Sequence, residues 1–115
     1  MQDKREFSRF DKQYTIMFCI KDAPHKSYDM SRLMDISKGG LKFFSYDYFP
    51  VGTTFIFHIR FPFLYPQILD IEGQVVAVKE VLQGKTYKIG VNFINQTPQA
   101  MGALSKMQEI NSKNK

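Results

Sequence analysis

Two short motifs contain the residues of this chain that could do chemistry together. The first motif places Arg5 and Arg9 four positions apart. The second has the spacing D-x-S-x-x-G and supplies Asp35, Ser37 and Gly40. Two guanidinium groups suit an anionic ligand that accepts hydrogen bonds. A carboxylate and a hydroxyl beside a glycine suit the donor edge of a base, so the two motifs together predict a site for a small nucleotide with phosphates.

Each feature also has a purely structural interpretation. Two arginines in a basic segment are often only a solvated arm, and an Asp-x-Ser sequence often only stabilises a turn. The Gly39–Gly40 pair can be no more than a tight turn. The two motifs in this order favour ligand binding, because a single short motif is often a chance match. Lys4 is a further candidate for phosphate contact, with a free surface lysine as an equal alternative.

The other reactive side chains indicate neither a catalytic site nor a metal site. Cys19 is the single cysteine, which excludes an internal disulfide, and its apolar neighbours are typical of a buried strand. Nothing in the sequence brings His25 or His58 to this thiol. Neither histidine has a cysteine or histidine at ligand spacing, so we expect no metal and no cofactor. Paired carboxylates and an activated nucleophile are also missing, and we expect no enzyme activity.

Composition indicates one globular domain, and the charge has two possible interpretations. The 115 residues are 43% hydrophobic and include eleven Phe and six Tyr, which favours strands. The net charge of +5 suits an anionic ligand or simply a solvated surface. The N-terminus lacks the apolar core of a signal peptide, and no apolar run reaches transmembrane length. We therefore expect a cytoplasmic protein that does not insert into a membrane.

Hydrophobic periodicity predicts the elements that must position these residues. Residues 1–12 are expected to form a flexible N-terminal arm, and residues 13–110 a folded domain. Strands are expected at residues 13–21, 27–36, 41–45, 53–61, 69–77 and 87–93. Turns are expected at residues 21–26, 50–52 and 83–85, a proline-bracketed loop at 62–66, and a bulge or bend near Val75.

A helix is expected to follow the last strand. Thr97 suits the N-cap and Pro98 the first turn. Ala100, Leu104 and Met107 then recur at helical spacing and predict an apolar stripe that packs on the sheet. Residues 111–115 are expected to be a basic tail.

These elements predict an all-β domain with one C-terminal α-helix. Six or seven strands of similar spacing suggest a small six- to seven-stranded antiparallel β-barrel of Greek-key type. A closed barrel would also leave no exposed edge on such aromatic strands.

The motifs resemble those of the PilZ domain family, whose members bind cyclic di-GMP, and the resemblance covers nearly the whole chain. Arg5 and Arg9 resemble the family's R-x-x-x-R arm, and residues 35–40 resemble its D-x-S-x-x-G turn. The stretches 50–52 and 87–93 are similar to further family stretches, the latter leading to the C-terminal helix.

The resemblance implies a role for each motif residue. Arg5 and Arg9 are expected to meet phosphate oxygens and the O6/N7 edge of guanine, an acceptor pair that matches an arginine fork. Asp35 is expected to accept hydrogen bonds from guanine N–H donors. Ser37 can bond the ligand or fix the turn. Gly40 lets the backbone approach the ligand or adopts a positive φ.

The resemblance also implies a function. The implied protein is a cytoplasmic bacterial receptor for cyclic di-GMP. It would regulate motility, surface polysaccharide or biofilm formation through a downstream protein partner. The arm would fold over the ligand, and this would change the direction of the N-terminal segment and present it to a partner. One alternative is a protein–protein interaction domain of the same fold that needs no ligand, although the chain retains both motifs. Another is a single-stranded nucleic-acid binder, but the aromatic residues follow core periodicity, so we do not expect nucleic acid.

Overall fold

Seven strands and one long helix make up the described part of the chain. The computed structural model describes residues 15–30 and 32–113, with side chains up to Ile110. The strands are β1 (Thr15–Ile20), β2 (Ala23–Asp29), β3 (Leu33–Ile36), β4 (Gly40–Ser45), β5 (Thr54–Arg60), β6 (Ile68–Leu82) and β7 (Thr86–Ile94). A short 3-10 helix, η1 (Pro62–Leu64), follows β5, and α2 (Pro98–Lys113) follows β7. The prediction of a mostly β domain with one C-terminal helix is confirmed.

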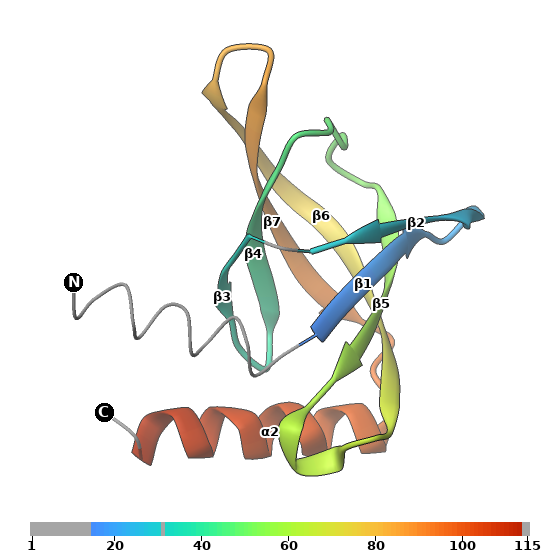
Figure 1. Cartoon of the computed structure of the whole chain (residues 1–115), viewed down its shortest axis with the longest axis vertical. Helices are drawn as coiled ribbons and strands as arrows, with labels where there is room; N and C mark the ends of the chain where they lie inside the picture. Colours follow the sequence, from blue (N-terminus) through green and yellow to red (C-terminus); the bar gives the residue numbers. More distant parts are fainter. Residues whose placement is uncertain (1–14, 31, 114–115) are drawn as a thin grey trace.

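The strands form one antiparallel sheet in the order β2-β1-β5-β6-β7-β4-β3. Figure 1 shows that the sheet is strongly curved and that α2 lies across one end of it. The amide of Met30 donates to the carbonyl of Ile16 in β1, whereas the amide of Phe44 in β4 donates to the carbonyl of Arg32. Consecutive parts of the chain thus attach to strands at opposite ends of the strand order.

This short link does not close the sheet. Among the described residues no hydrogen-bonded ladder joins β2 to β3, which remain the two edges. The predicted closed barrel is therefore not confirmed, and neither is the expectation that closure removes the edges. Pairing along each strand follows from alternation of residue type, but closure depends on one more ladder, which alternation does not specify.

The segment predicted as one strand over 27–36 is two strands. Met30, which follows β2, is 9% exposed and belongs to the core. At this residue the chain stops pairing with β1 and crosses to β4. The predicted turn at 21–26 is also too long, because only Lys21 and Asp22 form it and Pro24 lies inside β2. A proline has no N–H to donate, and it is tolerated here because β2 is an edge strand.

The core consists largely of phenylalanines that alternate along the strands. Phe55, Phe57, Ile59 and Phe61 are fully buried, which confirms the predicted inward face of this strand. Phe18 contacts the ring of Phe55 edge-on, with the ring centroids 4.9 Å apart. Such contacts add to the burial of apolar area and fix how the curved sheet packs on itself.

Two predicted irregularities of β6 and β7 are confirmed. The register of β6 against β7 shifts between Val75 and Ala77, which is the bulge expected there. The hairpin turn at 83–85 has Gly84 in the left-handed region, with φ of 67°. Beyond the bulge the alternation of β6 changes phase, so that Ala77 is the partner of Gly90.

The helix begins where the sequence predicts. Thr97 Oγ1 accepts a hydrogen bond from the amide of Ala100 at 3.1 Å, as an N-cap should. Leu104 and Met107 are fully buried, and burial of each contributes about 2 kcal/mol to folding. The helix continues to Lys113, into the segment expected to be a tail.

Candidate functional site

The second motif forms the tight turn between β3 and β4. The amide of Ser37 donates to the carbonyl of Gly40 at 2.9 Å, and the amide of Gly39 donates to Ser37 Oγ at 3.3 Å. Ser37 Oγ also lies 3.5 Å from the carbonyl oxygen of Gly40. These bonds bear out the expectation that Ser37 can fix the turn.

Two neighbouring elements hold this turn in place. The carbonyl of Gly39 accepts from the amide of Phe93 in β7 at 2.9 Å. On the helix, Gln108 Oε1 accepts from the amide of Lys38 at 3.1 Å. The side chain of Gln96 donates to the carbonyl of Lys38 at 3.3 Å. The turn is thus bonded to the last strand and to the helix before any ligand binds.

Gly40 is required by packing and not by backbone conformation. A Cβ at this position would overlap the carbonyl oxygen of Val91 and lie 3.2 Å from the Cα of Asn92. Among the described glycines, only Gly52 and Gly84 have φ in the left-handed region. The prediction that Gly40 could adopt a positive φ is therefore wrong, since the glycine lets β4 approach the backbone of β7 closely.

A shallow groove of about 330 Å³ lies beside the turn on the outer face of the sheet. The strand register places Asp35, Lys42, Gly90 and Ala77 in one row across β3, β4, β7 and β6. All four residues line the groove. A Cβ at Gly90 would lie 3.4 Å from the Cβ of Ala77. The floor is therefore built from small residues that leave room for a flat ligand, and Asp35 and Lys42 stand at one end of the row.

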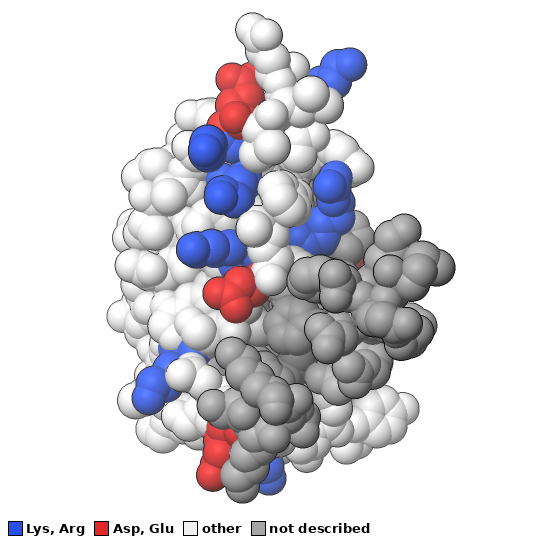
Figure 2. Space-filling model, turned by 90° about the vertical axis from the view of Figure 1, so that its left-hand side faces the viewer, with Lys and Arg blue, Asp and Glu red and all other residues white. Residues whose placement is uncertain are grey.

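Two charged side chains of the groove are not paired with each other. Asp35 is exposed and faces Lys42 across the strand pair, yet the two form no ion pair. Elsewhere in the described residues, Lys21 forms an ion pair with Glu72, and His58 contacts the carboxylate of Asp70. Figure 2 shows that Lys and Arg side chains gather on the side of the molecule that carries β3 and β4. The site therefore offers a carboxylate that is not paired with any other described residue, within a positive field.

Both of these contacts lie outside the groove. Lys21 Nζ lies 2.8 Å from a carboxylate oxygen of Glu72. This hydrogen bond holds the pKa of Glu72 below its usual range and raises the pKa of Lys21. The pair links the β1–β2 turn to β6, and neither of its residues lines the groove.

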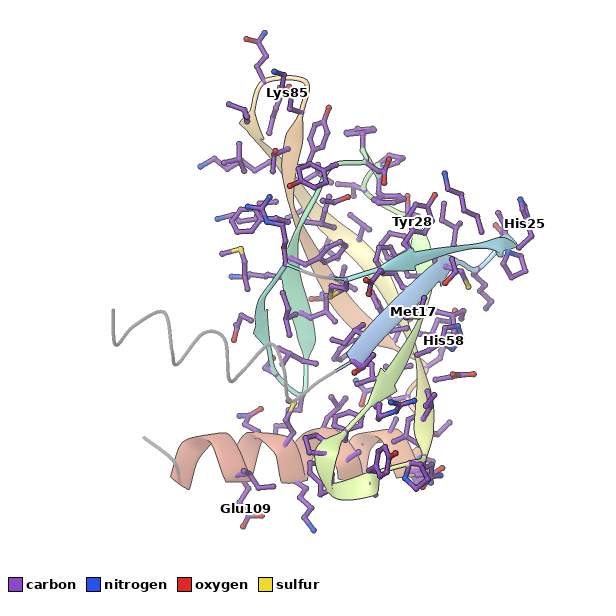
Figure 3. All side chains as sticks on the ribbon, viewed as in Figure 1. Met17, His25, Tyr28, His58, Lys85 and Glu109 are labelled. Atoms are coloured by element: carbon purple, nitrogen blue, oxygen red, sulfur yellow. The ribbon has the colours of Figure 1, made fainter. Side chains whose placement is uncertain are left out.

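The two histidines lie on different strands, and among the described residues no hydrogen bond joins either of them to Cys19. Figure 3 shows His25 at the outer end of β2 and His58 on β5. His58 Nδ1 lies 2.6 Å from a carboxylate oxygen of Asp70 in the neighbouring strand. Cys19 is buried, which confirms its interpretation as a strand residue. In the part of the chain that the structure describes, no group of three or more His, Cys, Asp or Glu side chains could hold a metal ion.

The structure thus places half of the predicted site residues. Asp35, Ser37 and Gly40 lie together on one turn beside the groove. Lys4, Arg5 and Arg9 lie outside the described residues.

The sequence analysis missed four residues that line the groove: Lys42, Ala77, Gly90 and Asn92. The alternation of their strands does place the last two outward. Only the register between β4, β6 and β7 brings them together, and no pattern within a single strand shows that register.

None of the helices in the described residues is both long and apolar enough to span a membrane.

Comparison with known proteins identifies the family. None of the curated proteins compared with the chain matches it. A family model described as the PilZ domain matches residues 3–107, a span that includes both motifs, the sheet and most of α2. PilZ domains are binding modules that generally take cyclic di-GMP. With nearly its whole length matched, the chain belongs to the PilZ domain family.

Proposed function

We propose that this domain binds cyclic di-GMP in the groove beside the 37–40 turn. The observation that carries the proposal is the carboxylate of Asp35, which has no ion-pair partner among the described residues and stands at the edge of a groove with a small-residue floor. Guanine presents two neighbouring N–H donors, at N1 and N2, and one carboxylate can accept from both. The flat base then lies over Gly90 and Ala77, where no large side chain stands in its way.

The first motif completes the proposed site. Arg5 and Arg9 fold over the seated ligand and bind its phosphates and the O6/N7 edge of guanine, with Lys4 adding a further phosphate contact. Ordering of the arm costs conformational entropy, which lowers the affinity below what the contacts alone would give. The same ordering changes the direction of the N-terminal segment, and a partner protein can recognise this change as the signal that ligand is bound.

The wider role is that of a cytoplasmic bacterial receptor. Family membership supports regulation of motility, surface polysaccharide or biofilm formation through a protein partner. The alternative is a protein-interaction domain of the same fold that needs no ligand. Asp35 favours the receptor, because it stands beside a hydrogen-bonded turn with no ion-pair partner in the described part of the chain, and an interaction domain does not need such an acceptor there.

Ligand identity provides the first test. Cyclic di-GMP is expected to bind at least thirtyfold more tightly than cyclic di-AMP in isothermal titration calorimetry. A matched bidentate pair discriminates by about 2 kcal/mol, and adenine presents an acceptor at N1 where Asp35 requires a donor. Equal affinities for the two dinucleotides would contradict the proposal.

The carboxylate of Asp35 provides the second test. Asp35→Ala is expected to weaken binding by about 1.5–3 kcal/mol, the range for hydrogen bonds to a charged group. The melting temperature should hardly change, because Asp35 is exposed and has no ion-pair partner within the described residues. Asp47→Ala removes an exposed carboxylate elsewhere on the surface and serves as the control. If both variants bind like the parent, Asp35 does not contact the ligand.

A further inference from the structure

Three lysines border the groove on the side that faces the β6–β7 hairpin turn. Lys79 of β6 and Lys88 of β7 are direct partners in the strand register. Lys42 of β4 is paired with Gly90, two residues from Lys88 along β7. Their neighbours along the strands point to the core: Phe43, Val78 and Ile89. By alternation the three lysines therefore share the outer face, and we call them the lysine strip.

No described acid is paired with the ammonium groups of the lysine strip, although the exposed Asp35 lies opposite Lys42 in the strand register. None of the three ammonium groups forms an ion pair, a hydrogen bond or a ring contact with another described residue. Glu80 is the adjacent acid, but it alternates to the other face of β6 and accepts a hydrogen bond from the amide of Gly84. Like charges directly opposite on neighbouring strands destabilise a sheet, so the Lys79–Lys88 pair costs stability in the free domain.

The lysine strip lies within reach of the groove. Lys79 and Lys88 are the next outward pair beyond Ala77 and Gly90, about 6–7 Å further along the strands. A lysine side chain is long enough to bridge that interval, and Lys42 lines the groove itself. A ligand with its donor edge on Asp35 and its base over the small-residue floor could place its phosphates at the border of the groove, next to these ammonium groups.

We infer that the lysine strip is a phosphate-binding subsite for the dinucleotide in the groove. The inference rests on the proposed function and deepens it, because it assigns phosphate binding to the sheet surface in addition to the arginine motif. Lysine suits this role as a mobile point charge that can follow a phosphate without fixed geometry. Bound phosphate also relieves the repulsion between Lys79 and Lys88, so the unfavourable pair of the free domain becomes favourable in the complex.

The test measures two quantities, the affinity for cyclic di-GMP and the melting temperature of the ligand-free domain. A binding role lowers the affinity without lowering the melting temperature, whereas a structural role lowers the melting temperature. Lys79→Gln/Lys88→Gln is compared with Lys26→Gln/Lys106→Gln, which removes the same charge from β2 and α2. In the full chain, the first variant is expected to bind cyclic di-GMP about tenfold more weakly and with less dependence on salt concentration. Its ligand-free melting temperature is expected to rise or stay level, because the repulsion is gone. The control should change affinity less than twofold.

Other results would overturn the inference. An unchanged affinity in Lys79→Gln/Lys88→Gln, with Asp35→Ala impaired, would exclude the lysine strip from the site. Equal losses of affinity in both double variants would mean that the net charge of the domain, and not the position of these lysines, determines the affinity. If the parent chain binds no cyclic di-GMP, the proposed function is wrong. An NMR titration with pyrophosphate then tests separately whether the lysine strip binds phosphate. Shifts of the Lys79 and Lys88 amides that the double substitution abolishes would still support a phosphate site, and their absence would exclude it.

Discussion

Replacement of both arm arginines, Arg5→Ala/Arg9→Ala, is expected to weaken cyclic di-GMP binding by about 10²- to 10⁴-fold. A hydrogen bond to a charged group contributes about 1.5–3 kcal/mol, and the two contributions add if the arginines act independently. The melting temperature is expected to stay within about 2 °C of the parent, because arginine is seldom a core residue and substitutions outside cores usually change stability little. Calorimetry and a thermal melt on the same preparation check both expectations.

The charge-matched control for this variant is again Lys26→Gln/Lys106→Gln. It lowers the net charge equally, so a loss confined to the arginine variant isolates the motif from general attraction of an anion. A sharp fall in melting temperature with unchanged affinity would instead mean that the arginines hold the fold together. In that case the sheet surface alone would have to supply the ligand contacts.

Gly40→Ala is expected to destabilise the domain by about 3 kcal/mol or more. The added methyl group overlaps the backbone of Val91, which cannot rotate away as a side chain could. Either β4 separates from β7 or the turn moves, and both changes disturb the groove. The melting temperature should fall by about 10–15 °C, and ligand affinity should fall with it.

Gly39→Ala is the matched control, one residue away in the same turn. Its Cβ would meet nothing closer than Ser37 Oγ at 3.9 Å, which is an ordinary contact, and φ at Gly39 is not in the left-handed region. We expect this variant to melt close to the parent. Similar melting temperatures for the two variants would contradict the close approach of β4 and β7.

The features that depend on one segment of sequence were predictable. The alternation that ends at Phe61, the N-cap at Thr97 and the buried Cys19 each follow from the neighbours of those residues, and the structure confirms them. The strand break at Met30 was not predictable, because a buried methionine between two extended segments has the same pattern as one continuous strand.

The features that depend on two distant segments were predictable only in part. Family resemblance assigns Asp35 and Gly40 to the site, but not the reason for the glycine, which lies in the backbone of Val91. Lys42 and Lys88 attract no notice as single surface lysines. They become candidates only when the register of β4 and β7 places them around one groove.

The open edge at β2 bears on how the protein behaves at high concentration. An unpaired strand offers its backbone to strands of other molecules, which is a common route to aggregation. Here Pro24 removes one backbone donor from that edge, and His25 and Lys26 follow it as exposed polar residues. Proline and lysine are known to discourage edge-to-edge association. These residues disfavour pairing of β2 with other molecules, so Pro24 is a position to preserve in any engineered variant.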